Sequence, residues 1–306
     1  MSIIQLDKSV ASQKLHKLPF PIKHGLADHR LFTLANLVDL AKKMPRDQIE
    51  FSSGDLEVGQ TGETTPQLDM APQDVIRQIE QHNAWMVIKR VEGVPEYHAV
   101  LKEFVDGLFE AAGIPDQKYT NLEGYIFVSS ANATTPFHVD AEENILVQIR
   151  GDKLVHVFDN DDCALVSEKA MEITPSKYRN QRYEASFEDR AEIFNLQPGD
   201  GLHIPWYMPH WVRVADQYSV SMAMTWKTPE VVRGNKIRLM NGTLRDFGWP
   251  QKAPGVSPVF DSFKVGIHDS ARLIIDPLRK SEKIRSLLRG LIYGKKANYY
   301  YNKPAE

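Results

Sequence analysis

The sequence predicts a mainly β domain, folded as a barrel, with helical segments before and after it. Short apolar segments separated by turn residues fill the middle of the chain, whereas apolar residues at helical spacing occur toward both ends. We therefore expect an N-terminal α/β region over residues 1–121, a barrel over residues 122–228 and a C-terminal helical region over residues 229–306. A chain of 306 residues is long enough for one large or two modest domains.

The N-terminal region is expected to contain three helices and a strand. Apolar positions at helical spacing predict a helix over residues 31–44 and another over residues 72–82, which leads into a strand at residues 85–91. The clearest helix covers residues 95–112 and ends at Gly113. Its apolar residues form one stripe, which we expect to pack in the core outside the barrel.

The barrel strands are predicted from alternating or continuous apolar runs between turn residues. Arg150-Gly151-Asp152 and Pro198-Gly199-Asp200 are the clearest turns. The expected strands cover residues 124–130, 145–149, 153–158, 192–195, 201–205, 211–214 and 218–226.

A polar insertion over residues 159–190 interrupts these strands. A segment of that length inside a barrel is usually either a functional lid or a disordered excursion, and we favour a lid that faces the substrate.

The C-terminal region is predicted to be helical over residues 229–247 and again after Pro258. A basic amphipathic helix is predicted over residues 281–292, because leucine and isoleucine recur there at helical spacing among arginine and lysine. Such a helix can contact an anionic membrane or a partner. Packing on its own domain or on a second copy of the chain is the commoner explanation.

Composition excludes several classes of protein. The net charge is −3 and the pI is about 6.4, so a nucleic-acid partner is not expected. The first eight residues do not resemble a secretion signal, and no run approaches the about 18 apolar residues of a membrane span. Cys163 is the single cysteine, which excludes an intrachain disulfide and favours the cytoplasm.

Three residues form a candidate metal site: His138, Asp140 and His210. Side chains alternate along a strand, so His138 and Asp140 point the same way while Val139 faces the packed side. His210 follows the Pro-Gly-Asp turn and a short strand, and can return beside this pair. Two imidazoles and one carboxylate occupy three positions of an octahedral metal and leave the others open for substrate and oxygen.

Lys153 is the second unusual residue. By strand alternation it shares one face with Val155 and Val157, near the metal pair. A buried lysine is costly unless an anion meets it. The carboxylate of a ligand would meet that need, and so would an aspartate or glutamate of the protein itself.

These residues resemble the Jumonji-C and cupin-like branch of the iron(II)- and 2-oxoglutarate-dependent oxygenases. Within it they are most similar to the subgroup that contains the asparaginyl hydroxylase of hypoxia-inducible factor. That subgroup's pattern T-P-x-H-x-D-x-x-x-N-x-x-x-Q-x-x-G-x-K is matched over residues 135–153, and PGD…IP…H over residues 198–210. The resemblance covers about residues 122–227 and implies a double-stranded β-helix, the jelly-roll barrel of the cupins.

The resemblance also implies a role for each matched residue. His138, Asp140 and His210 would hold Fe(II) as metal ligands. The other three would bind the cosubstrate 2-oxoglutarate: Lys153 and Thr135 at its distal carboxylate, and Asn144 near the metal. No further catalytic residue is implied.

The implied reaction uses one molecule of oxygen: one oxygen atom enters succinate as 2-oxoglutarate loses carbon dioxide, and the other hydroxylates a C–H bond of the substrate, which removes a methyl group where the attacked carbon is bonded to nitrogen. The substrate would be a protein side chain or a small molecule. Related enzymes often dimerise through C-terminal helices, so a homodimer is expected.

The chain departs from the family pattern at two places. Met208-Pro209 stands where a Trp-Trp pair often precedes the last histidine, and the strand ending near Trp226 lacks an asparagine that commonly contacts the cosubstrate. Two other functions therefore stay open: a cupin metalloenzyme that does not use 2-oxoglutarate, such as a dioxygenase or an isomerase, and a non-catalytic binding or regulatory module.

Overall fold

The computed structural model describes residues 3–60, 68–175 and 180–278. By compactness the chain divides into two units, Met1–Asn235 and Lys236–Glu306. The barrel and the candidate site belong to the first unit.

The elements before the barrel are short strands, helical turns and one long helix. In chain order they are β1 (Ile4–Gln5), α1 (Lys8–Lys14), β2 (Phe20–His24), η1 (Arg30–Phe32), α2 (Leu34–Lys43), η2 (Arg46–Gln48), β3 (Ile49–Ser53), α3 (Pro72–Arg77), β4 (Ala84–Lys89), η4 (Val91–Gly93) and α4 (Pro95–Ala111).

The barrel strands follow, with the insertion between the fourth and the fifth of them. In chain order the elements are β5 (Thr120–Ser129), β6 (Thr134–His138), β7 (Glu143–Arg150), β8 (Lys153–Val157), α5 (Glu168–Ile173), η5 (Ala185–Arg190), β9 (Glu192–Leu196), β10 (Asp200–Ile204), β11 (His210–Val214) and β12 (Ser219–Lys227). Every barrel strand that the sequence predicts is present, within a few residues of its expected bounds.

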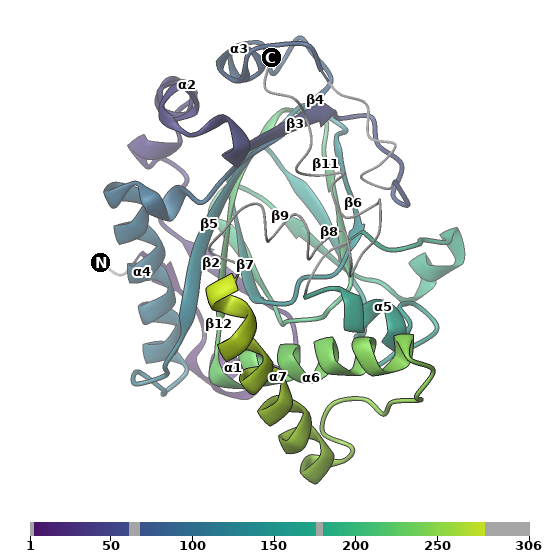
Figure 1. The fold of residues 1–306 in the computed structure, drawn as a ribbon. Helices are drawn as coiled ribbons and strands as arrows, with labels where there is room; N and C mark the ends of the chain where they lie inside the picture. The colour runs from purple at the N-terminus through teal and green to yellow at the C-terminus, as the bar shows by residue number, and fades with distance from the viewer. Residues whose placement is uncertain (1–2, 61–67, 176–179, 279–306) are drawn as a thin grey trace. The chain divides into compact units, whose positions relative to one another are not determined.

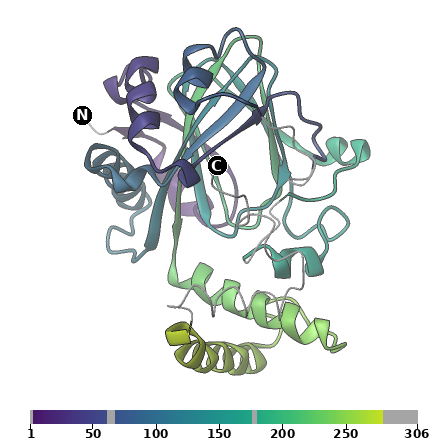
Figure 2. The same ribbon diagram turned by 45° about the horizontal axis from the view of Figure 1, so that its top comes forward.

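Two antiparallel sheets form the barrel (Figures 1 and 2). The larger sheet has eight strands in the order β1-β2-β10-β7-β12-β5-β4-β3, and the smaller has four in the order β6-β11-β8-β9. The mainly β jelly-roll with flanking helices that we expected is confirmed. β1, β2 and β3 are not predicted from the sequence, and they extend the larger sheet at both of its edges.

The larger sheet has an inner face toward the smaller sheet and an outer face toward the N-terminal helices. One apolar cluster fills the space between the sheets and includes Leu146 and Ala223 from the larger sheet and Val155 and Val212 from the smaller. A larger cluster covers the outer face, where α4 lies alongside the sheet (Figure 1). The predicted apolar stripe of α4 is buried there, as expected: Tyr97, Val100, Leu101, Phe104, Val105, Leu108 and Phe109.

The insertion covers the outer side of the smaller sheet in its described part. It contains α5 and η5, and its Tyr183 and Phe187 pack on Phe137 of β6. The amide N–H of Gln181 donates to the carbonyl of Phe137 at 2.8 Å, so the insertion runs beside the strand that carries His138. The described residues of the insertion are therefore ordered against the barrel, and a lid function stays a prediction.

The C-terminal helices begin where the sequence predicts them. α6 spans Pro229–Asp246 and α7 spans Pro258–Leu278. Within the second unit, Lys264 donates to the side-chain oxygen of Asn241 at 2.6 Å and Lys236 pairs with Asp269 at 2.7 Å. The basic segment 281–292 lies outside the described residues. Among the described helices none is both long enough and apolar enough to span a bilayer.

Candidate metal centre

The three predicted metal ligands come together at one end of the barrel. His138 is the last residue of β6, and it pairs directly with His210, the first residue of β11. Asp140 follows two residues after β6 has ended. One ligand atom from each residue lies within 4.8 Å of the other two. In the described part of the chain this is the one group of three or more His, Cys, Asp or Glu residues that could hold a metal ion.

A β-bulge in β6 sets which side chains face the site. His138 pairs with His210, but Thr135 pairs with Val212, so Pro136 and Phe137 together stand opposite one residue of β11. Strict alternation would place Thr135 and His138, three residues apart, on opposite faces. The bulge restores both to the inner face and turns Phe137 to the outer side, where it is fully buried.

Backbone carbonyls orient both imidazole rings so that their Nε2 atoms face Asp140. The Nδ1 of His138 lies 2.7 Å from the carbonyl of Pro136, and the Nδ1 of His210 lies 2.9 Å from the carbonyl of Met208. A carbonyl only accepts, so each Nδ1 carries a proton, and in the neutral ring the lone pair is then on Nε2. These Nε2 atoms lie 3.9 and 3.8 Å from Oδ2 of Asp140.

Burial also keeps His210 in the metal-binding form. It lowers the pKa of His210 to about 4, and the neighbouring His138 adds to the effect. The ring is therefore neutral near pH 7, and a neutral imidazole is the form that binds a metal.

Asp140 is held from two sides. Its Oδ2 accepts a hydrogen bond from Nδ2 of Asn144 at 3.2 Å, and its backbone carbonyl accepts from the amide N–H of Tyr207 at 2.7 Å. The hydroxyl of Tyr207 donates to Asn235, whose amide nitrogen donates to the carbonyl of Ala141 at 2.8 Å. This closed set of bonds fixes the loop after β6.

The contacts of Tyr207 and Asn235 are not predicted from the sequence. Tyr207 flanks His210, where we expect an aromatic residue to pack in the core or to shape the mouth of the substrate site. Its left-handed backbone, with φ of 64°, and its bonds to the loop after β6 give no signal in the sequence. Asn235 lies on α6, and nothing in its local sequence distinguishes it from a solvent-facing asparagine.

Lys153 points into the barrel and is 3% exposed. Its ammonium donates to the hydroxyl of Ser221 at 2.6 Å and lies 5.5 Å from the ring centroid of Phe127. No aspartate or glutamate among the described residues forms an ion pair with it. The structure therefore does not support an internal acid as the partner of Lys153, and the carboxylate of a ligand is the explanation that stays open. Burial lowers the pKa of Lys153 to about 7.

Thr135 and Asn144 also face the inside of the barrel. The indole N–H of Trp85 donates to Oγ1 of Thr135 at 2.9 Å, which leaves the hydroxyl's own hydrogen able to donate elsewhere. The side-chain oxygen of Asn144 is buried and has no hydrogen-bond partner in the described structure. Trp85 was not anticipated.

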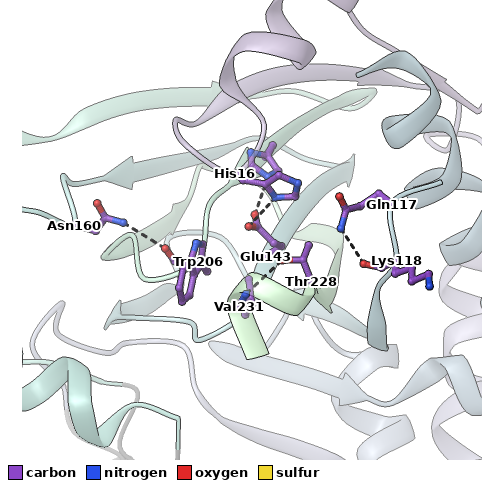
Figure 3. Close-up of polar contacts among 9 residues, drawn as sticks. His16, Gln117, Lys118, Glu143, Asn160, Trp206, Thr228 and Val231 are labelled. Carbon is purple, nitrogen blue, oxygen red and sulfur yellow. Dashed lines mark hydrogen bonds and ion pairs between the residues drawn. The ribbon is translucent and has the colours of Figure 1, made fainter. Parts of the chain in front are cut away.

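Three further histidines lie away from the metal centre. His203 could have faced the pocket, but it lies on the outer face of the larger sheet, where it bonds Oε2 of Glu143 at 3.1 Å. His16 bonds the other oxygen of the same buried carboxylate at 2.9 Å (Figure 3). His156 faces the outer side of the smaller sheet, bonds Glu188 and stacks on Trp211.

Solved structures of YcfD from Escherichia coli share this fold. One matches over 94% of this chain and 72% of its own, with a TM-score of 0.51 and 14% sequence identity. A structure of the same protein, described as a ribosomal oxygenase, with cobalt and succinic acid has a TM-score of 0.48 at 14% identity and covers 93% of this chain and 69% of its own. A third, with cobalt and 2-oxoglutarate, has a TM-score of 0.48 at 14% identity and covers 90% and 67%. At this identity the likeness shows the fold alone.

A family model agrees with the fold. No curated protein matches the chain in sequence. The model described as a cupin-like domain matches residues 60–230, more than half of the chain, and this match contains the metal centre and Lys153. The chain belongs to the family of proteins with a cupin-like domain.

Proposed function

We propose that this protein is an Fe(II)- and 2-oxoglutarate-dependent oxygenase that hydroxylates a protein side chain or a small molecule. The observation that carries the proposal is the buried ammonium of Lys153, which has no carboxylate partner among the described residues and shares a barrel with a two-histidine, one-carboxylate donor set. The donor set supports a metal, and the lysine supports an anionic cosubstrate.

The residues of the donor set fit a divalent iron. Both Nε2 atoms stand 3.8 to 3.9 Å from the same carboxylate oxygen, so modest side-chain movement would bring all three donors to bonding distance of one ion. Three donors on one side leave the remaining positions open, which is the arrangement of non-haem iron oxygenases. His138, Asp140 and His210 would hold the metal.

The position of Lys153 fits a dicarboxylate. Val157 pairs with His210, and Lys153 stands four residues earlier on the same strand and the same face. At about 3.3 Å per residue, its Cα lies about 13 Å from the metal end of β8, and its side chain extends back over part of that distance. A ligand that bridges the ammonium and the metal therefore has several carbons and a carboxylate at its far end.

Three side chains would orient this cosubstrate. Lys153 would pair with its distal carboxylate, and the Thr135 hydroxyl, whose oxygen already accepts from Trp85, would donate to the same group. The side chain of Asn144 bonds Asp140 through its nitrogen, and its oxygen, which has no partner among the described residues, would contact the metal end of the cosubstrate. The bound metal and 2-oxoglutarate supply the oxidising chemistry, while the protein positions them and excludes water.

The finer assignments rest on the sequence pattern. The match over residues 135–153 supports a hydroxylase related to the asparaginyl hydroxylase subgroup more than a demethylase. The cytoplasmic location and the homodimer through C-terminal helices stay predictions.

The proposal is tested by 2-oxoglutarate turnover. The purified chain, loaded anaerobically with Fe(II), should convert 2-oxoglutarate to succinate when oxygen is admitted, slowly alone and faster with a substrate. Asp140→Ala should abolish both rates, because it removes a metal ligand without touching the distal cosubstrate contact. Full turnover in Asp140→Ala would contradict the proposal, and so would a native chain that binds neither metal nor 2-oxoglutarate.

A further inference from the structure

The inner face of the larger sheet carries a carboxylate that the proposed reaction does not use. Thr225 of β12 pairs with Asn144 of β7 on one side and with Glu123 of β5 on the other. Directly paired residues of antiparallel strands point to the same face, so these three side chains form one row. Asn144 bonds the metal ligand Asp140, and therefore the row crosses the metal end of the barrel.

Strand alternation independently places Glu123 on the inner face. Tyr125 and Phe127, two and four residues later on β5, pack against the cluster between the two sheets. Neighbouring strands are about 4.8 Å apart, so Glu123 stands roughly 10 Å across the sheet from Asn144. Its side chain is half-buried, and the hydroxyl of Tyr125 donates to its Oε2 at 2.5 Å. The carboxylate is therefore held in place and accessible.

The lysines near this row are already paired. Lys89, which pairs with Tyr125 across the sheet, forms an ion pair with Glu50 at 2.6 Å. Lys227, two residues after Thr225, forms one with Glu142 at 3.2 Å. In the described part of the chain no lysine, arginine or histidine forms an ion pair with Glu123. The metal end of the inner face thus carries an uncompensated negative charge.

We propose that Glu123, oriented by Tyr125, binds a cationic group of the substrate, so that the substrate presents a guanidinium or an ammonium close to the bond that reacts. A half-buried carboxylate gains a charge-assisted hydrogen bond from such a group. A neutral substrate would leave the same carboxylate unpaired and partly desolvated. This inference rests on the proposed function, because it names the substrate class of the same site.

A structural explanation of the Glu123–Tyr125 contact makes a different prediction. If the carboxylate only anchors the tyrosine, Glu123→Gln keeps an oxygen that can accept from the hydroxyl, and ligand preference does not change. The isosteric variant therefore separates recognition from packing.

The experiment is calorimetric titration of the full chain with Mn(II), then with 2-oxoglutarate, then with probe peptides. The probes are two pairs of blocked tripeptides with a central arginine or citrulline, and a central lysine or norleucine. We expect the cationic member of at least one pair to bind about 10- to 100-fold more tightly than its neutral partner. Glu123→Gln should reduce that ratio to near one, whereas Glu103→Gln, which removes an exposed charge on α4, should leave it unchanged.

Each failure has its own signature. If Mn(II) and 2-oxoglutarate do not bind, the proposed function fails, and the peptide titrations without them still measure the preference for a cation. If both bind but the paired peptides bind equally, or no cationic peptide binds, or Glu123→Gln keeps the preference, the inference is overturned. Arginine amide serves as a small-molecule probe, and tighter binding of the peptide than of the amide indicates a protein substrate.

Discussion

The ammonium of Lys153 lies 2.6 Å from the hydroxyl of Ser221, inside a barrel that offers it no carboxylate among the described residues. One neutral acceptor and the face of Phe127 do not replace the hydration that a charged lysine loses on burial. The fold therefore keeps a residue that costs stability. Such an arrangement is expected where a ligand supplies the missing anion.

Replacing Lys153 with methionine should stabilise the protein and remove cosubstrate binding. At pH 7.5 the lysine is protonated in the unfolded chain, while burial lowers its pKa in the folded protein from 10.5 to about 7. Folding therefore requires the lysine to lose its proton or to be buried with its charge, and either lowers the free energy of unfolding. Methionine fills similar space without a charge. We expect the free energy of unfolding of the metal-free protein to rise by about 1–4 kcal/mol, measured by urea denaturation.

The same substitution at an exposed lysine provides the control. Lys118 is exposed and forms no ion pair with a described residue, so Lys118→Met should change stability by less than about 0.5 kcal/mol. A loss of 3 kcal/mol or more in Lys153→Met would mean that the ammonium has an internal partner, and the argument for an anionic ligand would fail. Unchanged 2-oxoglutarate affinity would instead favour a cupin enzyme that does not use it.

The affinity for 2-oxoglutarate should fall as the pH rises above 7. Both carboxylates of the ligand are ionised throughout this range, so the change comes from the lysine, whose pKa in the free protein is about 7. Below that value the ammonium is already present. Above it, binding must take up a proton, and the affinity should fall by up to about tenfold per pH unit. Calorimetry with Mn(II) in buffers of different ionisation enthalpy measures both the affinity and the proton uptake.

Lys153→Arg tests the origin of this dependence, since a guanidinium stays charged at these pH values. The variant should bind 2-oxoglutarate with an affinity that does not change between pH 6.5 and 8.5. If the affinity of the wild-type protein is also independent of pH in this range, Lys153 is already charged before 2-oxoglutarate binds.

Much of the site follows from strand periodicity alone. The two-residue alternation correctly places Lys153 with Val155 and Val157 on the inner face. Alternation alone does not predict which side chains of β6 face inward. The bulge at Pro136 and Phe137 depends on pairing with β11, and no local sequence pattern reveals that pairing.

Long-range packing decides the features that sequence reasoning missed. β2 is five residues long and contains a proline, and it is a strand because it pairs with β10 from nearly 180 residues away. His203 faces outward because alternation on β10 gives the inner face to Leu202 and Ile204. Its partner Glu143 then receives a second bond from His16, a contact between residues 127 positions apart.

Asn144→Ala should weaken metal binding. The asparagine amide holds Oδ2 of Asp140 at 3.2 Å, and a ligand that loses such a partner is less well oriented. We expect the affinity for Mn(II) to fall about 10- to 100-fold, with the fold retained. Asn195→Ala, on an exposed position of β9, should leave the affinity unchanged. Equal affinities in the two variants would show that the hydrogen bond does not orient the ligand.

Glu143→Gln should destabilise the protein at neutral pH and less so in acid. Burial alone would raise the pKa of Glu143, but hydrogen bonds from His16 and His203 outweigh it and hold the pKa below its ordinary value of 4.5. A lowered carboxylate pKa contributes stability that is complete above pH 4.5 and is lost as the pH falls through the folded value. We expect a loss of about 3 kcal/mol at pH 7.

The pH profile distinguishes this charge effect from a simple packing defect. The difference between wild type and Glu143→Gln, followed by thermal or urea unfolding, should shrink steadily below pH 4.5. Glu110→Gln, an exposed substitution on α4, should show no difference at any pH. A deficit in Glu143→Gln that is constant with pH would mean that the carboxylate is protonated in the folded protein.

Gly151→Ala should cost more stability than Gly113→Ala, although both glycines adopt positive φ, +67° and +79°. A Cβ at Gly113 would meet no atom within 4 Å, so alanine there costs only the left-handed backbone, about 1–2 kcal/mol. At Gly151 it would stand 2.3 Å from the carbonyl oxygen of Tyr218, and backbone must move to admit it. We expect a loss of about 3 kcal/mol or more in the free energy of unfolding, measured by urea denaturation.

The same pair of variants should differ in cosubstrate binding. Gly151 lies in the turn that directly precedes Lys153, so Gly151→Ala should bind 2-oxoglutarate more weakly, while Gly113→Ala should bind it normally. Equal free energies of unfolding in the two variants would show that the backbone around Gly151 moves aside without loss of stability.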